Sequence, residues 1–287
     1  MDEWVADIEF ERQGPLRRVL KGVLINPLAN YLPAGLMRAM LGFGKSELAA
    51  ANWIEPGGWR SMVISYHGRP RQIADRLLVG MGTMSMALRN RKKLGSRLLA
   101  RLIEQSHREP AHVLCLGAGP GQITVDAMTQ ADCESHATLV DLNAEPFDFG
   151  RELAAKHGLS DKVRFIQADL REDIQHLLDQ PPDLVKMIGI CEYLDDELIV
   201  QIARVAAEVM PPAAPIVFNS LSKAHGNDRF FRRVFGLHMI YRTPEQLQEL
   251  MRRAGFEQFH AIREPLGVYH VIVARRAAEL PPATRGS

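Results

Sequence analysis

Short apolar runs alternate with longer amphipathic stretches along the second part of the chain. The runs at 113–116, 138–142, 163–167, 184–190 and 216–220 are almost continuously apolar, as strands buried on both faces of a parallel sheet are. The stretches between them have helical spacing and end at helix breakers. This alternation predicts an α/β fold, in which a doubly wound parallel sheet carries helices on both faces.

A further helix and two strands are predicted after the fifth run. Thr243 is a suitable N-cap, and Pro244 at the first helical position begins a helix that we expect to end at Gly255. The runs 256–263 and 268–274 are joined by turn-forming residues. They predict an antiparallel pair at the edge of the sheet.

Residues 1–110 have a different pattern. They are rich in Leu, Met, Arg and Lys, have helical spacing at 87–105, and are interrupted by prolines. We predict a helical N-terminal region that serves either as a cap over the sheet or as a dimerisation element. The sheet domain is expected at 111–276, and 277–287 is expected to be a disordered tail.

The composition is that of an ordinary globular chain. Of its 287 residues, 46% are hydrophobic and 24% are charged, and 35 Lys and Arg balance 34 Asp and Glu. Because this balance leaves no surplus positive charge for a phosphate backbone, no nucleic-acid partner is expected. No apolar run reaches the roughly 18 to 20 residues of a membrane span, and the first residues are acidic where a signal peptide is basic. We therefore expect a cytoplasmic protein without a membrane partner.

The cysteines add little chemistry of their own. Cys115, Cys133 and Cys191 are odd in number and have no metal-ligand spacing with each other or with histidines. A disulfide framework and a structural zinc site are both disfavoured. We predict reduced thiols and no metal.

Three glycines at alternate positions follow the first predicted strand. Gly117, Gly119 and Gly121 lie between a buried strand and a helix, so the backbone there can approach a ligand closely. A dinucleotide fingerprint has the spacing G-x-G-x-x-G, whereas here the third glycine comes one residue early and Pro120 removes a backbone donor. NAD is therefore disfavoured. A tight strand-to-helix turn without a ligand is the alternative interpretation.

Two aspartates favour a ligand at this loop. Asp141 follows Gly121 by 20 residues and ends the second strand, where a carboxylate can accept both hydroxyls of a ribose. Asp169 follows the third strand and could accept a hydrogen bond from an adenine amino group. Either residue alone could be a helix cap. Three polar features at the carboxyl ends of three successive strands together predict an adenosine site.

At this point the region 89–276 resembles the class I S-adenosylmethionine-dependent methyltransferases. The matching segments are LGAGPGQ (116–122), LVDLN (139–143), QADL (167–170), IGICEYLDD (188–196) and RTPEQLQELMRRAGF (242–256). The resemblance implies a Rossmann-like, seven-stranded sheet with a reversed last hairpin, and S-adenosylmethionine as cofactor. The residues it assigns to cofactor binding are Gly117, Ala118, Gly119, Gly121, Asp141, Leu142, Asp169, Leu170, Ile188 and Gly189. The acceptor does not follow from it.

Cys115 departs from the pattern of this family. Members usually carry Asp or Glu two residues before the first glycine, where the carboxylate helps to hold the cofactor's ammonium. An uncharged thiol cannot do so. Either another group holds the amine, or the amine is free because it reacts at the cofactor's γ-carbon. The latter chemistry is cyclisation to azetidine-2-carboxylate or aminocarboxypropyl transfer, and both release methylthioadenosine. A weak similarity to nicotianamine synthases, in the glycine loop and at 223–226, points the same way.

Candidate catalytic residues follow the fourth and fifth strands. Glu192 could act as a general base, and Tyr193 could orient an amine or hydroxyl near the sulfonium. Asn219 and Ser220 end the fifth strand at the same rim. A helix-terminal acid, a core-edge aromatic and ordinary strand-end polar residues are the structural alternatives. No N-P-P-Y motif is present, which disfavours transfer to a nucleobase amine.

An aromatic group in the N-terminal region could form a lid. Trp53, Trp59 and Tyr66 occur near two adjacent glycines, and ring faces attract a sulfonium cation. Local core packing is the alternative. Arg89 belongs to a basic run with Arg91, Lys92 and Lys93, for which the simplest interpretation is a solvated helix face. A clamp for a carboxylate is the other.

The sequence thus predicts a transferase that uses S-adenosylmethionine. The first hypothesis is a methyltransferase that acts on a small metabolite in biosynthesis, and the second is chemistry at the γ-carbon with the cofactor as the sole substrate or as a donor. A cofactor-binding regulator without activity is a third. A homodimer is an expected assembly.

Overall fold

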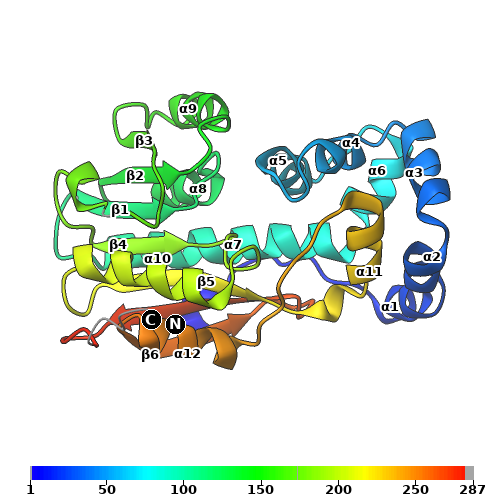
Figure 1. Ribbon diagram of the computed structural model, residues 1–287. Helices are drawn as coiled ribbons and strands as arrows, with labels where there is room; N and C mark the ends of the chain where they lie inside the picture. The colour runs from blue at the N-terminus through cyan, green and yellow to red at the C-terminus, as the bar shows by residue number, and fades with distance from the viewer. Residues whose placement is uncertain (1, 173, 282–287) are drawn as a thin grey trace.

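A seven-stranded sheet forms the centre of the molecule. The computed structural model describes residues 2–172 and 174–281 (Figure 1). The strand order is β3-β2-β1-β4-β5-β7-β6, with β1 to β5 parallel and β7 antiparallel to both β5 and β6. The strands are β1 (Ala111–Leu116), β2 (Ser135–Asp141), β3 (Val163–Gln167), β4 (Leu184–Met187), β5 (Pro215–Leu221), β6 (Phe256–Arg263) and β7 (Tyr269–Arg276). The predicted Rossmann-like sheet with a reversed last hairpin is confirmed.

Alternate residues of the central strands enter two apolar layers. In β1, Leu114 belongs to the core beneath α10 (Asp196–Val209) and α12 (Pro244–Arg253), whereas Val113 belongs to the core beneath α7 (Thr83–Glu104) and α8 (Gln122–Gln130). Because both faces are covered, the strands are apolar throughout, which explains why the sequence pattern revealed them. The main helices are these four and α9 (Phe147–Lys156). The predicted Thr243 cap begins α12, where it forms a capping box with Gln246.

Two strands differ from the prediction, β3 in its burial and β4 in its length. β3 pairs with β2 alone and lies at the edge, so its residues are half-buried or exposed. β4 ends at Met187 rather than at Ile190, because Gly189 adopts a φ of +93° that a strand cannot continue. Residues 188–190 therefore form a loop at the carboxyl end of the sheet.

Short helices precede the sheet and lie beside it (Figure 1). They are η1 (Asp2–Val5), α1 (Pro15–Leu20), η2 (Lys21–Ile25), α2 (Asn26–Tyr31), α3 (Ala34–Phe43), α4 (Glu47–Ile54), α5 (Trp59–His67), α6 (Ile73–Asp75) and η3 (Arg76–Gly80). In Figure 1, α4 and α5 stand across from β1, β2 and α8, and α1 to α3 lie further out. Connecting turns between strands are η4 (Gln175–Leu177), η5 (Lys223–His225), α11 (Asp228–Phe230) and η6 (Phe231–Phe235).

The long helix α7 joins these helices to the sheet. Its first part contacts α5, and its second part buries Leu94 and Leu98 against the sheet. The boundary at residue 110 stays a prediction, since α7 belongs to both regions. Of the predicted tail, 277–281 contains no helix or strand, and 282–287 lies outside the described residues. Across the part of the chain that the structure describes, no helix is long and apolar enough to cross a membrane.

Candidate active site

The glycine loop after β1 leaves its backbone accessible to a ligand. All three glycines have positive φ values, of +62° at Gly117, +52° at Gly119 and +75° at Gly121. A side chain at Gly117 would collide with Ile190, and one at Gly121 would collide with Leu139. Nothing lies within 4 Å of the position that a Cβ of Gly119 would occupy. Gly119 is therefore the point where a ligand can lie against the loop.

Asp141 is held beside this loop, as predicted. Its Oδ2 accepts a hydrogen bond from the backbone N–H of Gly119 at 2.7 Å, and its Oδ1 accepts one from the N–H of Asn143 at 3.0 Å. A carboxylate has about four acceptor sites, so lone pairs remain on both oxygens. The carboxylate is fixed in place while it can still accept the two hydroxyls of a ribose.

A cleft of about 210 Å³ lies over the loop. Its floor comes from the carboxyl ends of β1, β2 and β4 and includes Gly119, Asp141 and Gly189. Its roof comes from the α4–α5 region and includes Trp59 and Tyr66. Ligands bind at this edge of open α/β sheets. The structure thus places two predicted lid residues opposite the predicted cofactor loop.

Hydrogen bonds tie the roof to the floor. The indole N–H of Trp59 donates to Glu145 Oε2 at 3.2 Å, and Arg60 forms an ion pair with the same carboxylate. Tyr66 Oη accepts a hydrogen bond from Arg91 Nη2 at 2.8 Å. These contacts join α5 to the loop before α9 and to α7, which holds the roof over the cleft.

Trp53 and Arg89 do not line the cleft. The indole N–H of Trp53 donates to the carbonyl of Val234 at 3.0 Å, so this side chain anchors α4 to η6. Arg89 donates to the carbonyls of Ser65 and Val79, both at 3.0 Å, and forms an ion pair with Glu11. Trp53 thus connects the N-terminal region to η6, whereas Arg89 connects separate parts of the N-terminal region itself.

The interpretation of the basic run as a solvated helix face is wrong for two of its members. Arg89 and Arg91 are buried. Arg91 Nη1 lies 2.9 Å from Glu192 Oε1, with both side chains only 3% exposed, and its guanidinium stacks over the ring of Tyr269. Burying two charges is unfavourable unless they are paired, so the pair persists because each charge has a partner. Lys92 remains at the surface, where it pairs with Asp126.

Glu192 and Asn219 form a buried network behind the cleft. Beside its ion pair with Arg91, Glu192 accepts a hydrogen bond from Asn219 Nδ2 at 3.4 Å. Asn219 Oδ1 accepts the N–H of Gly189 at 2.7 Å. The network positions the loop after β4. Ser220 is buried, and its hydroxyl has no hydrogen-bond partner among the described residues. The structure brings these residues together but leaves Asn219, Ser220 and Glu192 out of the lining of the cleft.

Tyr193 is the predicted catalytic residue that lines the cleft. Its side chain is 38% exposed, yet its hydroxyl lies against Gly57 of the roof, where a Cβ would be 2.7 Å away. Burial of the hydroxyl and the nearby Glu192 carboxylate raise its pKa above the usual range. The hydroxyl therefore stays protonated near neutral pH and can donate a hydrogen bond.

Four predicted cofactor-binding residues, Gly121, Leu142, Asp169 and Leu170, lie outside the cleft lining. The carboxylate of Asp169 is bound by Arg171, whose hydrogen bonds lower its pKa to about 2. Leu170 packs in the core, and Leu142 is 65% exposed. Ala118 and Ile188, in contrast, line the cleft with the other predicted glycines.

Lys186 was not predicted. It is buried in the middle of β4, lines the cleft, and donates a hydrogen bond to Cys115 Sγ at 3.3 Å. The signal was present in the sequence, because a lysine inside an otherwise apolar strand is unusual. Cys115 occupies the position where family members usually carry an acid, and the Lys186 ammonium contacts its sulfur.

The comparisons with known proteins decide the family. Residues 71–276 match the model of a family described as “Putative methyltransferase”. The chain belongs to the class I S-adenosylmethionine-dependent methyltransferase family. No curated protein sequence matches the chain. Residue 71 lies before α7, so the family match includes this helix as well as the sheet.

Solved structures share the fold of this chain. A possible exported protein from Bordetella parapertussis is 19% identical, with a TM-score of 0.72 over 92% of this chain and 93% of that one. A “putative O-methyltransferase” from Nostoc punctiforme is 17% identical, with a TM-score of 0.53 over 88% and 71%. The pyocyanin biosynthetic protein PhzM is 14% identical, with a TM-score of 0.54 over 96% and 76%. At these identities the likeness concerns the fold.

Proposed function

We propose that this protein binds S-adenosylmethionine in the cleft and methylates a small metabolite. The observation that carries the proposal is the roof formed by α4 and α5, which leaves about 210 Å³ above the glycine loop. Because α4 and α5 stand over the glycine loop, a small acceptor can reach it from the open side of the cleft, whereas a folded macromolecule is kept away. The bound cofactor would supply an electrophilic methyl group.

The residues present fit this cofactor. Gly119 leaves open space for an adenosyl group, and Asp141 offers carboxylate oxygens to its ribose. Trp59 and Tyr66 place aromatic rings at the cleft, where each ring face attracts a sulfonium by roughly 0.5 to 2 kcal/mol. Tyr193 can orient an acceptor with its protonated hydroxyl.

Methyl transfer is tested by incubating the protein with S-adenosylmethionine and a panel of small amines, phenols and carboxylic acids. S-Adenosylhomocysteine, measured by liquid chromatography and mass spectrometry, should appear only when an acceptor is present. A matched reaction with Tyr193→Phe should be slower while affinity for the cofactor stays nearly unchanged. Tight cofactor binding without turnover on any acceptor would instead support a regulator.

The contact between Lys186 and Cys115 favours a second candidate, displacement at the γ-carbon. The lysine ammonium lies against the thiol of Cys115, the position at which the family usually carries a carboxylate for the cofactor's ammonium. A neighbouring cation disfavours a second positive charge, so this position lowers the pKa of an amine bound there. A neutral amine is a nucleophile, whereas an ammonium is not.

Cyclisation needs no second substrate. The amino nitrogen forms a bond to the γ-carbon, the bond from that carbon to sulfur breaks, and its electron pair stays on the sulfur. The products are azetidine-2-carboxylate and methylthioadenosine. In this reaction Lys186 would keep the amine neutral.

Incubation with S-adenosylmethionine alone separates the two candidates. Methylthioadenosine and azetidine-2-carboxylate without any acceptor support cyclisation, and no product until an acceptor is added supports methylation. Cys115→Asp restores the family's usual acid and places it beside Lys186. Cyclisation should then fall at least about tenfold while cofactor binding persists, since a held ammonium no longer reacts. Cys115→Ser is the matched control, because it adds no charge.

A further inference from the structure

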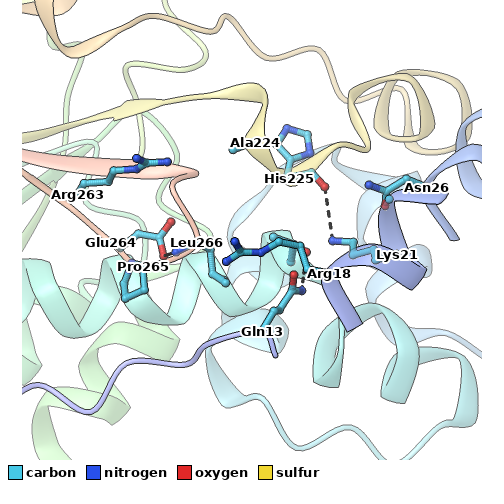
Figure 2. A pocket seen from close by; sticks show the side chains of 12 residues that line it. Gln13, Arg18, Lys21, Asn26, Ala224, His225, Arg263, Glu264, Pro265 and Leu266 are labelled. Atoms are coloured by element: carbon cyan, nitrogen blue, oxygen red, sulfur yellow. Dashed lines mark hydrogen bonds between the residues drawn. The ribbon is translucent and has the colours of Figure 1, made fainter. Parts of the chain in front are cut away.

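A second and larger cavity lies away from the cleft (Figure 2). Its volume is about 620 Å³, and it shares no lining residue with the cleft. The N-terminal helices form one wall, and η5 and the turn between β6 and β7 form the other. Its size is within the range of small-molecule sites.

Positive side chains from separate elements line this cavity. Arg18 comes from α1, Lys21 begins η2, and Arg263 ends β6 (Figure 2). Within the described ranges neither Arg18 nor Arg263 has an ion-pair partner. No carboxylate of the described residues is therefore in direct ion-pair contact with either guanidinium.

The carboxylate of Glu264 belongs to the lining but is occupied by the chain itself. Its Oε1 accepts the backbone N–H of Val268 at 2.7 Å, and its Oε2 accepts the N–H of Leu266 at 2.8 Å. Asn90 Nδ2 also donates to Oε2, at 3.1 Å. These bonds shape the turn after β6. They leave the net charge at the cavity positive.

Two buried polar groups lack adequate partners. Lys21 is only 7% exposed, and its ammonium reaches a single recorded acceptor, the carbonyl of His225, at 3.5 Å. An ammonium has three hydrogens to donate. Asn26 Oδ1 is buried without a partner among the described residues. Such groups carry a free-energy cost that a ligand can remove.

The ionisation of these groups agrees with an anion site. Burial, with a smaller contribution from Arg17, lowers the pKa of Lys21 to about 8, so the ammonium is still the main form at pH 7. Burial lowers the pKa of His225 to about 4, so its ring is neutral there. The positive charge of the cavity at neutral pH therefore comes from Lys21 and the arginines.

We propose that this cavity binds a phosphate monoester, whose dianion contacts Lys21, Arg18 and Arg263. Guanidinium groups bind phosphate oxygens in a bidentate manner, and a lysine ammonium adds a compact charge. A hydroxyl of the same ligand donates to Asn26 Oδ1. The site is separate from the cofactor cleft and does not depend on the function proposed for it.

Calorimetric titration with glycerol 3-phosphate tests the site. The wild-type protein should bind it saturably, and Lys21→Met should weaken binding at least about tenfold. Arg263→Gln changes an exposed side chain, so it should fold normally and weaken binding as well. Lys156→Met is the matched control, since this exposed lysine lies on α9 far from the cavity, and it should bind as the wild type does.

Further measurements distinguish the possible sources of the phosphate group, and some results would contradict the proposal. Binding of the protein to phosphatidic acid vesicles, but not to phosphatidylcholine vesicles, would identify a lipid headgroup, and preference for glycerol 3-phosphate would identify a free metabolite. Absence of saturable binding at millimolar concentration overturns the proposal, as does equal affinity in wild type, Lys21→Met and Arg263→Gln. Lys21→Met should bind S-adenosylmethionine with the same affinity as the wild type. A loss of phosphate binding can then be attributed to the second cavity and not to the cofactor cleft.

Discussion

The floor and the roof of the cleft are built in different ways. The floor consists of contiguous segments at the ends of β1, β2 and β4, and each segment carries its own signal in the sequence. The roof depends on contacts between distant residues, such as Trp59 with Glu145 and Arg91 with Glu192, which are 86 and 101 positions apart. Local backbone geometry therefore creates the floor, whereas tertiary contacts create the roof.

The two regions also differ in how they treat apolar side chains. The sheet buries them on both faces, but the outer helices α1 to α3 leave many exposed. Examples are Leu16 at 82%, Val23 at 75% and Phe43 at 93%. Large exposed apolar surfaces mark interaction sites. The homodimer expected from the sequence remains a prediction, and these helices are the surface on which we expect a second copy.

The largest effect on cofactor binding by the floor is expected at Gly119. Gly119→Val should abolish saturable binding of S-adenosylmethionine in calorimetry, because a branched side chain fills the space where the ligand lies. Gly158→Val is the matched control, since Gly158 also has a positive φ, of +70°, and open space around it. If both variants bind equally well, the ligand does not lie at this loop.

The contact between the roof and the floor should be lost when Arg91 is replaced. Arg91→Met leaves Glu192 as an unpaired buried carboxylate, so the free energy of unfolding should fall by about 3–5 kcal/mol. Urea denaturation measures it. Arg204→Met, which removes the exposed pair with Glu208, should cost no more than about 0.5 kcal/mol. Equal losses in the two variants would contradict the assignment of a buried ion pair.

Lowering the pH should reduce the free energy of unfolding through His225, whose carbonyl contacts Lys21 of the N-terminal helices. Its pKa of about 4 in the folded chain is below the ordinary 6.5, so the unfolded chain binds more protons between these values. Stability is fully present above about pH 6.5 and decreases as the pH falls toward 4, by about 3 kcal/mol. Urea midpoints from about pH 4.5 to 7 should show a smaller pH slope in His225→Gln. An unchanged slope would exclude this residue as its source.

The smallest effect is expected at the outer helices. Val23→Glu places a charge on the exposed apolar surface and should shift a dimer toward monomer in size-exclusion chromatography with light scattering. Leu142→Glu is the control, because Leu142 is similarly exposed but lies on the sheet side. A wild-type protein that is monomeric at all concentrations would contradict the predicted dimer.

The sequence predicted those features that are local. The glycine loop, Asp141 and the N-cap at Thr243 each depend on a few neighbouring residues, and the structure places them as expected. The positions of Trp53, Arg89 and Glu192 depend on partners far along the chain, which no spacing rule indicates. The cytoplasmic location and the acceptor also remain predictions. Lys186 was visible as a charge in an apolar strand, but its contact with Cys115 requires β1 and β4 to be neighbours.

The length of α7 has a consequence for how this family can diversify. Arg91 links the roof to Glu192, while Gly95, one turn later, lies so close to Ile188 that a Cβ there would be 2.9 Å from its Cδ1. A single-residue insertion between them would rotate one half of the helix by about 100° relative to the other. The guanidinium would then face away from its carboxylate. We therefore expect insertions to be tolerated in the loops around α7. An insertion between Arg91 and Gly95 should not be tolerated, because this turn fixes the position of Arg91 relative to the contact with Ile188.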